Sequence, residues 1–481
     1  MSFTIQNVLI PTSEGYQTVN VQIQNDRILA VTSPCAQGSA PNLEVIGTAI
    51  DGTHKLLLPG FVNAHTHSSE MWQRGMIPPV PLELWLAELY EFAPLDPEQA
   101  YLSAVGTAIE TLMTGGTSVV DHLVLIPGKE IETIAAANRG YREVGIRAFI
   151  APLIQDEVMS AGLPTGGDEV SHGSYDRSTK ETLNLVQEAV EQFHRPDEGV
   201  EILVAPTGIQ LCSDALFEGC IELSDRYNLS RHAHLLETKA QKLLADEKYG
   251  CSAVQHLKDI GWLSEKTSLA HCVWLDEHDI KILAETRSTV VHNPLSNLRL
   301  GSGIAPILKY RQAGVNVAFG CDGSASNDSQ DLLEAVKIGS ILHSVTDPDY
   351  QHWITPRQSV EMAALGGATG LNRADQFGSL EVGKKADLVM YDLKSLSLLP
   401  RTDPIGLLVL GRPVNVVSHA WVNGKQVIAD HEICNINVND LKEKLFDQSE
   451  WTPKRKSIAV SETEARYRSV MGLSGNSIGY S

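Results

Sequence analysis

The sequence predicts an α/β protein built on a (β/α)8 TIM barrel, with a small β-sandwich domain formed from both ends of the chain. The middle of the chain alternates strand-like and helix-like segments, and both ends are rich in strand patterns. The 481 residues suit a barrel of about 250–330 residues plus a smaller companion. We therefore expect a composite β-sandwich from residues 1–58 and 378–435, a barrel over 59–377, and a C-terminal tail over 436–481.

Strand-like alternation of apolar and polar residues marks both ends of the chain. The segments are 2–31, 386–393 and 415–428. Asn25-Asp26 in the first segment and Asn423-Gly424 in the last are residue pairs that tight turns favour. We expect the two ends to meet in one small sandwich, and two unrelated end caps are the alternative.

Eight apolar or β-branched runs between these ends are the candidate barrel strands. They are residues 61–67, 117–122, 147–153, 201–207, 230–235, 268–273, 288–293 and 316–322. Intervening stretches such as 97–114 and 179–194 carry apolar residues at helical spacing. Polar residues gather at the C-terminal ends of the runs, where barrel enzymes place their chemistry.

Two segments stand outside this alternation. Residues 156–178 are rich in Gly, Ser and Asp and follow the third candidate strand, so they are either a lid over the site or an exposed insertion. Residues 440–481 are polar and charge-rich, which fits a surface-packed or partly disordered tail.

Composition narrows the range of partners. The formal net charge of −21 repels nucleic acid and anionic membranes. The seven cysteines are scattered without a C-x-x-C pair, as in proteins of a reducing compartment. The chain begins with strand-like MSFTIQNVLIP rather than a signal segment, and its apolar runs are shorter than the ~20 residues that cross a bilayer. We predict a cytoplasmic protein that binds a small molecule, and neither nucleic acid nor membrane.

Six side chains with metal or proton chemistry follow the candidate strands. They are His65 and His67 in AHTH, His234 and Glu237 in HLLE, His271 in LAHCV, and Asp322 in FGCDG. Each motif alone is weak, because an H-x-H is more often two ordinary histidines. Together, neutral imidazoles and a carboxylate on one barrel rim form a site for zinc or iron that leaves one position open for water. The set therefore predicts an enzyme with a metal-activated water.

Several longer blocks resemble a known family. They are LLLPGFVNAHTH, HLLET, LAHCVWLDE, VVHNPLSNLRLGSGIAPI, GCDGSASND and GSLEVGKKADLV. They are similar to the metal-dependent amidohydrolases, in the branch of aminohydrolases and triazine hydrolases. That branch includes guanine, 8-oxoguanine and S-adenosylhomocysteine deaminases and atrazine chlorohydrolases. The resemblance extends over roughly residues 1–430.

The resemblance implies roles for the six residues. The metal ligands would be His65, His67, His234 and Asp322, and the residues that handle protons would be Glu237, His271 and Asp322. Related branches bridge a second metal with a modified lysine on the fourth strand, but EILVAPTG has no lysine here. We expect one divalent metal per chain, Zn²⁺ first and Fe²⁺ as the alternative.

The chemistry follows from these roles. A bound metal lowers the pKa of its water and gives hydroxide near neutral pH, and Asp322 can accept the proton. Hydroxide then attacks a ring carbon while Glu237 protonates the adjacent ring nitrogen. His271 would hold the oxygen of the adduct, and ammonia, an amine or chloride would leave. The predicted function is deamination of an amino-substituted N-heterocycle, a hydrolysis of a non-peptide C–N bond in a cyclic amidine.

Other residues are candidates for substrate binding or support. Glu70 stands where guanine deaminases carry a purine-binding glutamine, and its alternative is a salt bridge to Arg74. Trp85 either walls the pocket or belongs to the core. His292 is expected to support the metal ligands through a buried hydrogen bond rather than to bind the metal.

Departures from the family bear on the substrate. Members that act on nucleosides carry a substrate-binding histidine where this chain has Thr207, with Gln210 nearby. They place a ribose-binding glutamate where this chain has Leu84. Both changes favour free purine, pyrimidine, pterin or triazine rings over adenosine-like substrates.

Two other functions stay open. A triazine dechlorinase or an N-dealkylating amidohydrolase would use the same site. A catalytically silent binding protein is the more remote alternative, since such proteins usually lose ligands. The family also suggests a homodimer or larger homo-oligomer.

Overall fold

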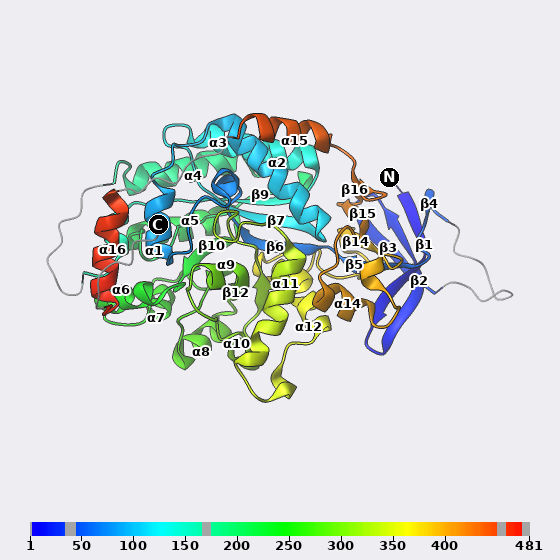
Figure 1. Cartoon of the computed structure of the whole chain (residues 1–481). Coiled ribbons are helices and arrows are strands. Elements are labelled where there is room, and N and C mark those ends of the chain that lie inside the picture. Colours follow the sequence, from blue (N-terminus) through cyan, green and yellow to red (C-terminus); the bar gives the residue numbers. More distant parts are fainter. Residues whose placement is uncertain (1, 34–44, 166–174, 450–457, 474–481) are drawn as a thin grey trace.

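The computed structural model describes residues 2–33, 45–165, 175–449 and 458–473. The chain forms a barrel of strands surrounded by helices, with a strand-rich part at one side (Figure 1). The N-terminus lies in the strand-rich part, and helix α16 lies on the opposite side of the barrel. Among the described helices, none is long and apolar enough to cross a membrane.

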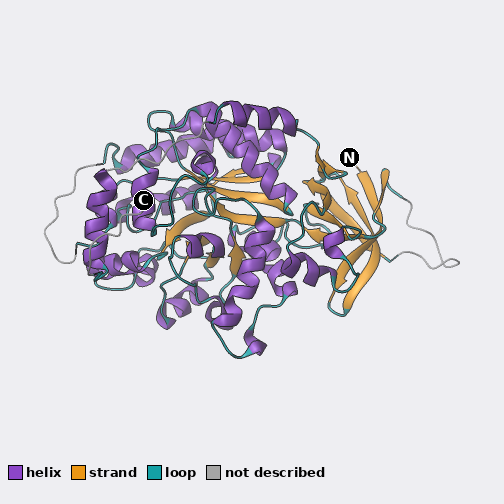
Figure 2. Ribbon diagram, viewed as in Figure 1, coloured by secondary structure: helices purple, strands orange, loops and turns teal. Residues whose placement is uncertain are grey.

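Eight parallel strands form the centre of the barrel (Figure 2). They form two groups, ordered β6-β7-β8-β9 and β10-β11-β12-β13. Their bounds are β6 Phe61–Thr66, β7 Gly116–Leu123, β8 Arg147–Pro152, β9 Val200–Ile202, β10 Arg231–Leu235, β11 Thr267–His271, β12 Thr289–His292 and β13 Val317–Phe319. Each strand predicted from the sequence has its counterpart in this set, so the alternating βα pattern is confirmed.

Backbone contacts connect the two groups at both seams. Val204, just after β9, forms a parallel bridge with Arg231 at the start of β10. At the other seam the Asp322 N–H donates to the His65 carbonyl at 2.9 Å. These contacts bring the first and last strands of the barrel side by side, so that residues far apart in sequence share one rim.

Helices follow the strands and cover the barrel. Their bounds are α1 Leu82–Leu89, α2 Pro97–Met113, α3 Glu130–Val144, α4 Thr179–Phe193, α5 Asp214–Tyr227, α6 Lys239–Tyr249, α7 Ala253–Asp259, α8 Glu277–Thr286, α9 Pro294–Arg299, α10 Ile307–Gln312, α11 Leu332–Ile341, α12 Pro356–Glu361, α13 Gly367–Gly370 and α14 Pro404–Gly411. The two helices predicted by spacing are α2 and α4. Each begins with a capping box, Asp96 with Gln99 and Ser178 with Glu181, which satisfies the first backbone N–H groups.

The barrel interior is filled by small and aromatic side chains. Alanines 64, 151, 205 and 318, from four different strand segments, pack with Phe149 and with Phe377 from the segment after α13 in one buried cluster. Small residues leave room for the side chains that project at the rim. The interior is a packed core rather than a pore, as in barrels of this type.

The strands at the two ends of the chain form one nine-stranded sheet. Its order is β17-β16-β15-β14-β5-β1-β2-β3, and β4 pairs with β1. The bounds are β1 Ser2–Thr12, β2 Gly15–Gln24, β3 Arg27–Thr32, β4 Thr48–Asp51, β5 Lys55–Pro59, β14 Leu388–Asp392, β15 Val417–Val422, β16 Lys425–Ala429 and β17 Glu432–Ile433. Both predicted turns, Asn25-Asp26 and Asn423-Gly424, connect adjacent strands.

This sheet closes over its own hydrophobic core. Ile5 and Val21 from the N-terminal strands pack with Leu388 and Trp421 from the C-terminal strands in one buried cluster. The backbone N–H of Ile28 donates to the Lys384 carbonyl at 2.9 Å, which joins the two halves again. The two chain ends therefore meet as expected, and the division of the chain into domains stays a prediction.

The end of the described chain returns to the barrel. Helix α15 spans Val438–Asp447, and α16 spans Ile458–Val470 and packs against α1. The Arg466 guanidinium donates to the carbonyls of Ser160, Leu163 and Pro164. The described part of the predicted tail is therefore helical and packed. The predicted lid, 156–178, lies partly outside the described residues.

A buried ion pair connects the barrel to the nine-stranded sheet. Arg147 at the start of β8 donates from Nε and a terminal nitrogen to the Asp387 carboxylate at 2.8 and 3.1 Å. Both side chains are at most 2% exposed. The Asn423 backbone N–H also donates to Asp387 at 2.7 Å, so the hairpin turn belongs to the same junction.

We predict that Asp387→Ala lowers the free energy of unfolding by about 3–5 kcal/mol, because it leaves a buried guanidinium without its counterion. Urea denaturation checks this. Glu98→Ala is the matched control, since it breaks the Arg139–Glu98 pair, whose side chains are 52% and 49% exposed. That control should change stability by less than about 1 kcal/mol. Equal losses of unfolding free energy in the two variants would show that the buried ion pair stabilises the fold no more than the exposed pair does.

Candidate active site at the barrel rim

The six predicted residues meet at the C-terminal ends of the barrel strands. His65 and His234 lie near the ends of β6 and β10, His271 ends β11, and His67, Glu237 and Asp322 lie one to three residues beyond their strands. All are buried except His234, which is partly exposed. The structure thus brings together the six residues that the sequence analysis named.

Four of these side chains direct ligand atoms toward one point. His67 Nε2 lies 3.2 Å from His234 Nε2. Asp322 Oδ1 lies 3.3 Å from His65 Nε2 and 3.5 Å from His67 Nε2. Ligand atoms of a tetrahedral zinc site are about 3.4 Å apart, because each is 2.0–2.2 Å from the metal. The spacing of these atoms therefore fits a single divalent metal.

The hydrogen bonds of the imidazoles agree with metal binding. His67 Nδ1 donates to the His122 carbonyl at 2.6 Å, and His234 Nδ1 donates to the Thr207 carbonyl at 2.7 Å. With the proton held on Nδ1, each Nε2 keeps a lone pair for the metal. His65 Nε2 is buried without a hydrogen-bond partner, as a metal ligand would be. Burial lowers the pKa of His65 to about 4, which keeps this ring neutral at pH 7.

Glu237 and His271 lie beside this metal-binding set. Glu237 Oε2 is 3.5 Å from His271 Nε2, which is 3.7 Å from Asp322 Oδ2. His271 Nδ1 donates to Asn297 Oδ1 at 2.9 Å, so Nε2 faces the two carboxylates. Burial raises the pKa of Glu237 to about 7, although the nearby His271 opposes this. Glu237 is thus able to hold and release a proton near neutral pH.

The backbone leaves its strand geometry where these side chains begin. The φ angles of Leu236, His271 and Asp322 are 45°, 74° and 63°, in the left-handed region that non-glycine residues rarely adopt. Each such residue costs about 1–3 kcal/mol. Thr66 Oγ1 and Gln330 Nε2 donate to the Asp322 carbonyl at 2.9 and 2.7 Å and hold the last of these kinks.

Glu70 lies beside the site, packed against the loop that follows Asp322. Its Oε2 accepts from the Ala325 N–H at 3.2 Å, and burial raises its pKa to about 7. A Cβ at position 323 would lie 1.8 Å from Glu70 Oε2, so any larger residue there would displace the Glu70 carboxylate. The alternative salt bridge with Arg74 is wrong, because Arg74 pairs with Glu110 at 2.8 Å.

The structure places the other substrate-binding candidates differently. Trp85 is 3% exposed, packs among apolar residues and donates to the Ala325 carbonyl at 3.2 Å, so it supports the Glu70 loop from the core. The Thr207 hydroxyl donates to the Ile154 carbonyl at 3.0 Å, and Thr207 positions His234 through its own carbonyl. Gln210 is 8% exposed, and its side-chain amide has no hydrogen-bond partner among those found for the described residues. Of these three, Gln210 has polar atoms to offer a substrate.

His292 does not support the metal ligands through a hydrogen bond. Its Nε2 lies 3.1 Å from His343 Nε2, and the described residues show no hydrogen bond from its ring to the four ligands. The expectation was wrong on this point because the His292 ring faces the helical segment after α11. The two rings form a buried pair of their own.

Several residues that support the site were missed from the sequence. They are His122, His232, Asn297, Ser302 and Gln330. The signal for His232 was present, since it stands two positions before His234 within an apolar strand. Polar residues that interrupt a buried strand generally need a partner, and this rule would also have selected His122.

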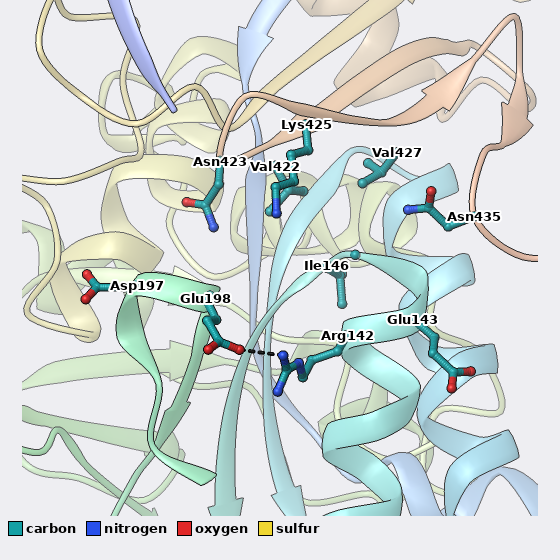
Figure 3. Close-up of a pocket in the computed structure, with 12 residues that line it drawn as sticks. Arg142, Glu143, Ile146, Asp197, Glu198, Val422, Asn423, Lys425, Val427 and Asn435 are labelled. Carbon is teal, nitrogen blue, oxygen red and sulfur yellow. Dashed lines mark ion pairs between the residues drawn. The ribbon is translucent and has the colours of Figure 1, made fainter. Parts of the chain in front are cut away.

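A separate cavity lies far from this chemistry. It has a volume of about 690 Å³ and lies between the loops before β8 and β9 and the β15–β16 hairpin (Figure 3). Arg142 and Glu198 form an ion pair in its wall. Because its lining residues include none of the six rim residues, we assign the reaction to the rim and not to this cavity.

We predict that the purified protein holds about one transition metal per chain and that His65→Ala loses it, because three ligands remain of four. Metal analysis of the two proteins checks this. His256→Ala, at an outer histidine paired with Asp214, is the control and should keep the metal. Two equivalents per chain would contradict the single site.

Comparison with known proteins agrees with this geometry. The profile of the "Amidohydrolase family" matches residues 56–427. A 5-methylthioadenosine/S-adenosylhomocysteine deaminase of Caldanaerobacter subterraneus subsp. tengcongensis is 31% identical over 444 residues, 91% of this chain and 95% of the relative. A 5'-deoxyadenosine deaminase of Methanosarcina barkeri is 32% identical over 407 residues, 83% of this chain and 87% of the relative.

Solved structures share the fold. An adenosine deaminase from Xanthomonas campestris with bound zinc superimposes with a TM-score of 0.79 at 26% identity, covering 97% of this chain and 98% of the other. An atrazine chlorohydrolase from Arthrobacter aurescens TC1 with zinc gives 0.82 at 25% identity, covering 92% and 99%. The TIM-barrel architecture with a strand-rich terminal part is therefore confirmed. The chain therefore belongs to the amidohydrolase family as a metal-dependent hydrolase, and its histidine and aspartate cluster is compatible with a single divalent metal.

Proposed function

We propose that this protein hydrolytically deaminates an amino-substituted N-heterocycle, releasing ammonia and leaving a ring carbonyl. The observation that carries the proposal is a buried carboxyl, Glu237, 3.5 Å from His271 and beside a cluster of histidines and an aspartate that could hold a metal. Hydrolysis of a cyclic amidine needs an activated water on one side of the reacting bond and an acid on the other. The rim provides both within one buried space.

Each residue has a defined task in this reaction. The metal, when bound, lowers the pKa of water so that it attacks near neutral pH. Asp322 accepts the proton of the water as the new C–O bond forms. Glu237 gives its proton to the ring nitrogen next to the attacked carbon, so that negative charge does not build up there. His271 Nε2, between the two carboxylates, contacts the oxygen of the adduct. The amino group takes up the proton held by Asp322 and leaves as ammonia, and the hydroxyl of the adduct returns a proton to Glu237 as the carbonyl forms.

The same arrangement would also expel chloride or an alkylamine. The similarity to atrazine chlorohydrolase favours this second candidate. Product analysis separates the two, since deamination alone releases ammonia. A catalytically silent binding protein has little support, because the four ligand candidates and the acid are all in place.

Two sets of observations bear on whether the substrate ring carries a sugar. The sequence favoured free rings on the basis of Thr207 and Leu84, but the Thr207 hydroxyl is bonded to the Ile154 carbonyl and Leu84 is buried. Neither residue is therefore evidence for or against a sugar on the substrate. The relatives are named for adenosine derivatives. We propose an adenosine derivative as the substrate to test first, with free amino-heterocycles as the alternative that Glu70 favours. A cytoplasmic location and a homo-oligomeric state stay predictions.

The direct test is ammonia release from a panel of aminated heterocycles, with and without their sugar, by zinc-loaded protein. On the best substrate, we predict that Glu237→Gln keeps the metal but lowers kcat by roughly 10²–10⁴-fold, because the amide has no acidic proton to give. Glu98→Gln, at an exposed carboxylate, should act like wild type. Loss of metal from Glu237→Gln would mean that this residue is a ligand and not the acid.

Glu70 provides a test of recognition. A buried carboxylate makes stronger hydrogen bonds to N–H groups than an amide does. We therefore predict that Glu70→Gln lowers kcat/KM on the best substrate at least tenfold, or about 1.4 kcal/mol. Metal content measured in the same sample should not change. Wild-type kcat/KM in this variant would remove Glu70 from the substrate pocket and leave the metal chemistry intact.

A further inference from the structure

The three histidine ligands differ in what holds their second ring nitrogen. For His67 and His234 the partner of Nδ1 is a backbone carbonyl, which only accepts. The partner of His65 Nδ1 is the Nε2 atom of another ring, His232, at 2.8 Å. An imidazole nitrogen either donates or accepts. The proton of His65 is therefore not fixed by its partner alone.

His232 belongs to a chain of buried hydrogen bonds. Its Nδ1 lies 2.7 Å from Ser268 Oγ, which lies 3.3 Å from the Arg231 carbonyl. At the other end, His65 Nε2 lies 3.3 Å from Asp322 Oδ1. His65 and His232 are fully buried, so both rings are held in the neutral form.

This chain is complete in either of two directions. In the first, His65 Nδ1 donates to His232, His232 Nδ1 donates to Ser268, and Ser268 donates to the Arg231 carbonyl. In the second, Ser268 donates to His232, His232 Nε2 donates to His65, and the proton on His65 Nε2 faces Asp322 Oδ1, 3.3 Å away. Only the first direction leaves a lone pair on His65 Nε2, so only the first allows this ring to bind a metal.

We propose that His232 and Ser268 are positioning residues that set the direction of this chain and so make His65 available as a metal ligand. The proposal relies on His65 being a ligand and is independent of the substrate. The Arg231 carbonyl, which only accepts, is the fixed end that favours the metal-ready direction. Asp322 lies at the opposite end of the chain and favours the other direction, because its carboxylate faces His65 Nε2 and can attract a proton there. A metal bound by both His65 and Asp322 would occupy that carboxylate oxygen and so remove this preference.

A second metal at the same histidines is the competing explanation. His65, His122 and His232 each bring a ring nitrogen within 4.8 Å of the others. The 2.8 Å contact between His65 and His232 uses the nitrogens that such a metal would need. His122 Nε2 already lies 3.1 Å from the Ala205 carbonyl. A hydrogen-bonded chain therefore accounts for the contact between His65 and His232 better than a second metal does.

The test measures zinc affinity rather than turnover. His232→Phe keeps a ring but removes the acceptor, so His65 can keep its proton on Nε2 toward Asp322. We expect the zinc dissociation constant, measured in competition with a chelator, to rise about 10–100-fold, as for other residues that orient a ligand. His343→Phe is the matched control, because it replaces another fully buried histidine whose ring, among the described residues, hydrogen-bonds to His292 and to none of the four ligands. Its zinc affinity should equal that of the wild type.

Two further variants keep the proposal falsifiable if His232→Phe does not fold. His232→Gln retains an oxygen that can accept from His65 Nδ1 and should restore most of the zinc affinity. Ser268→Ala removes the acceptor of His232 Nδ1 and should weaken zinc binding to a smaller extent than His232→Phe. Unchanged affinity in Ser268→Ala and His232→Phe would overturn the proposal. So would an equal loss in His343→Phe, or two zinc ions per wild-type chain, one of which is lost in His232→Phe.

Discussion

Nitrogen and oxygen lone pairs of four side chains converge to within 3.2–3.5 Å in a buried space. Without a cation between them, such lone pairs repel each other and lack hydrogen-bond partners, which is expensive away from water. The fold tolerates this because other parts of the barrel fix each side chain. Backbone carbonyls hold two of the imidazoles, and Gln330 and Thr66 hold the kink at Asp322. The rim therefore holds lone pairs where a divalent metal would accept them.

Much of this could be predicted from the sequence for a physical reason. Parallel strands buried on both faces are continuous apolar runs, so a polar residue that ends such a run marks the rim. That rule located all eight strands and placed His234 and Asp322 on the same side. Side-chain partners do not follow from such runs. Arg74 pairs with Glu110, and His292 pairs with His343. Both pairings depend on side-chain rotamers and on helices that are distant in sequence.

The packing of helices α1 and α16 could not be predicted from the sequence either. Helix α1 carries Glu83, whose carboxylate accepts from the Thr238 hydroxyl next to Glu237, and α16 packs against α1 from the far end of the chain (Figure 1). Arg466 of α16 is bonded to carbonyls after β8. A polar tail has no pattern that predicts such a position.

Two acidic groups near the metal have pKa values raised to about 7, and charge balance explains how they can differ in role. A divalent cation and the Asp322 carboxylate leave one positive charge, which a single further anion neutralises. Ionising both Glu70 and Glu237 would leave excess negative charge in a buried site, so one of them tends to hold a proton. Backbone N–H groups of Ala325 and Ser326 favour the charged form of Glu70. The Ser302 hydroxyl favours the charged form of Glu237 as well, so the role of acid is assigned to Glu237 from its position 3.5 Å from His271.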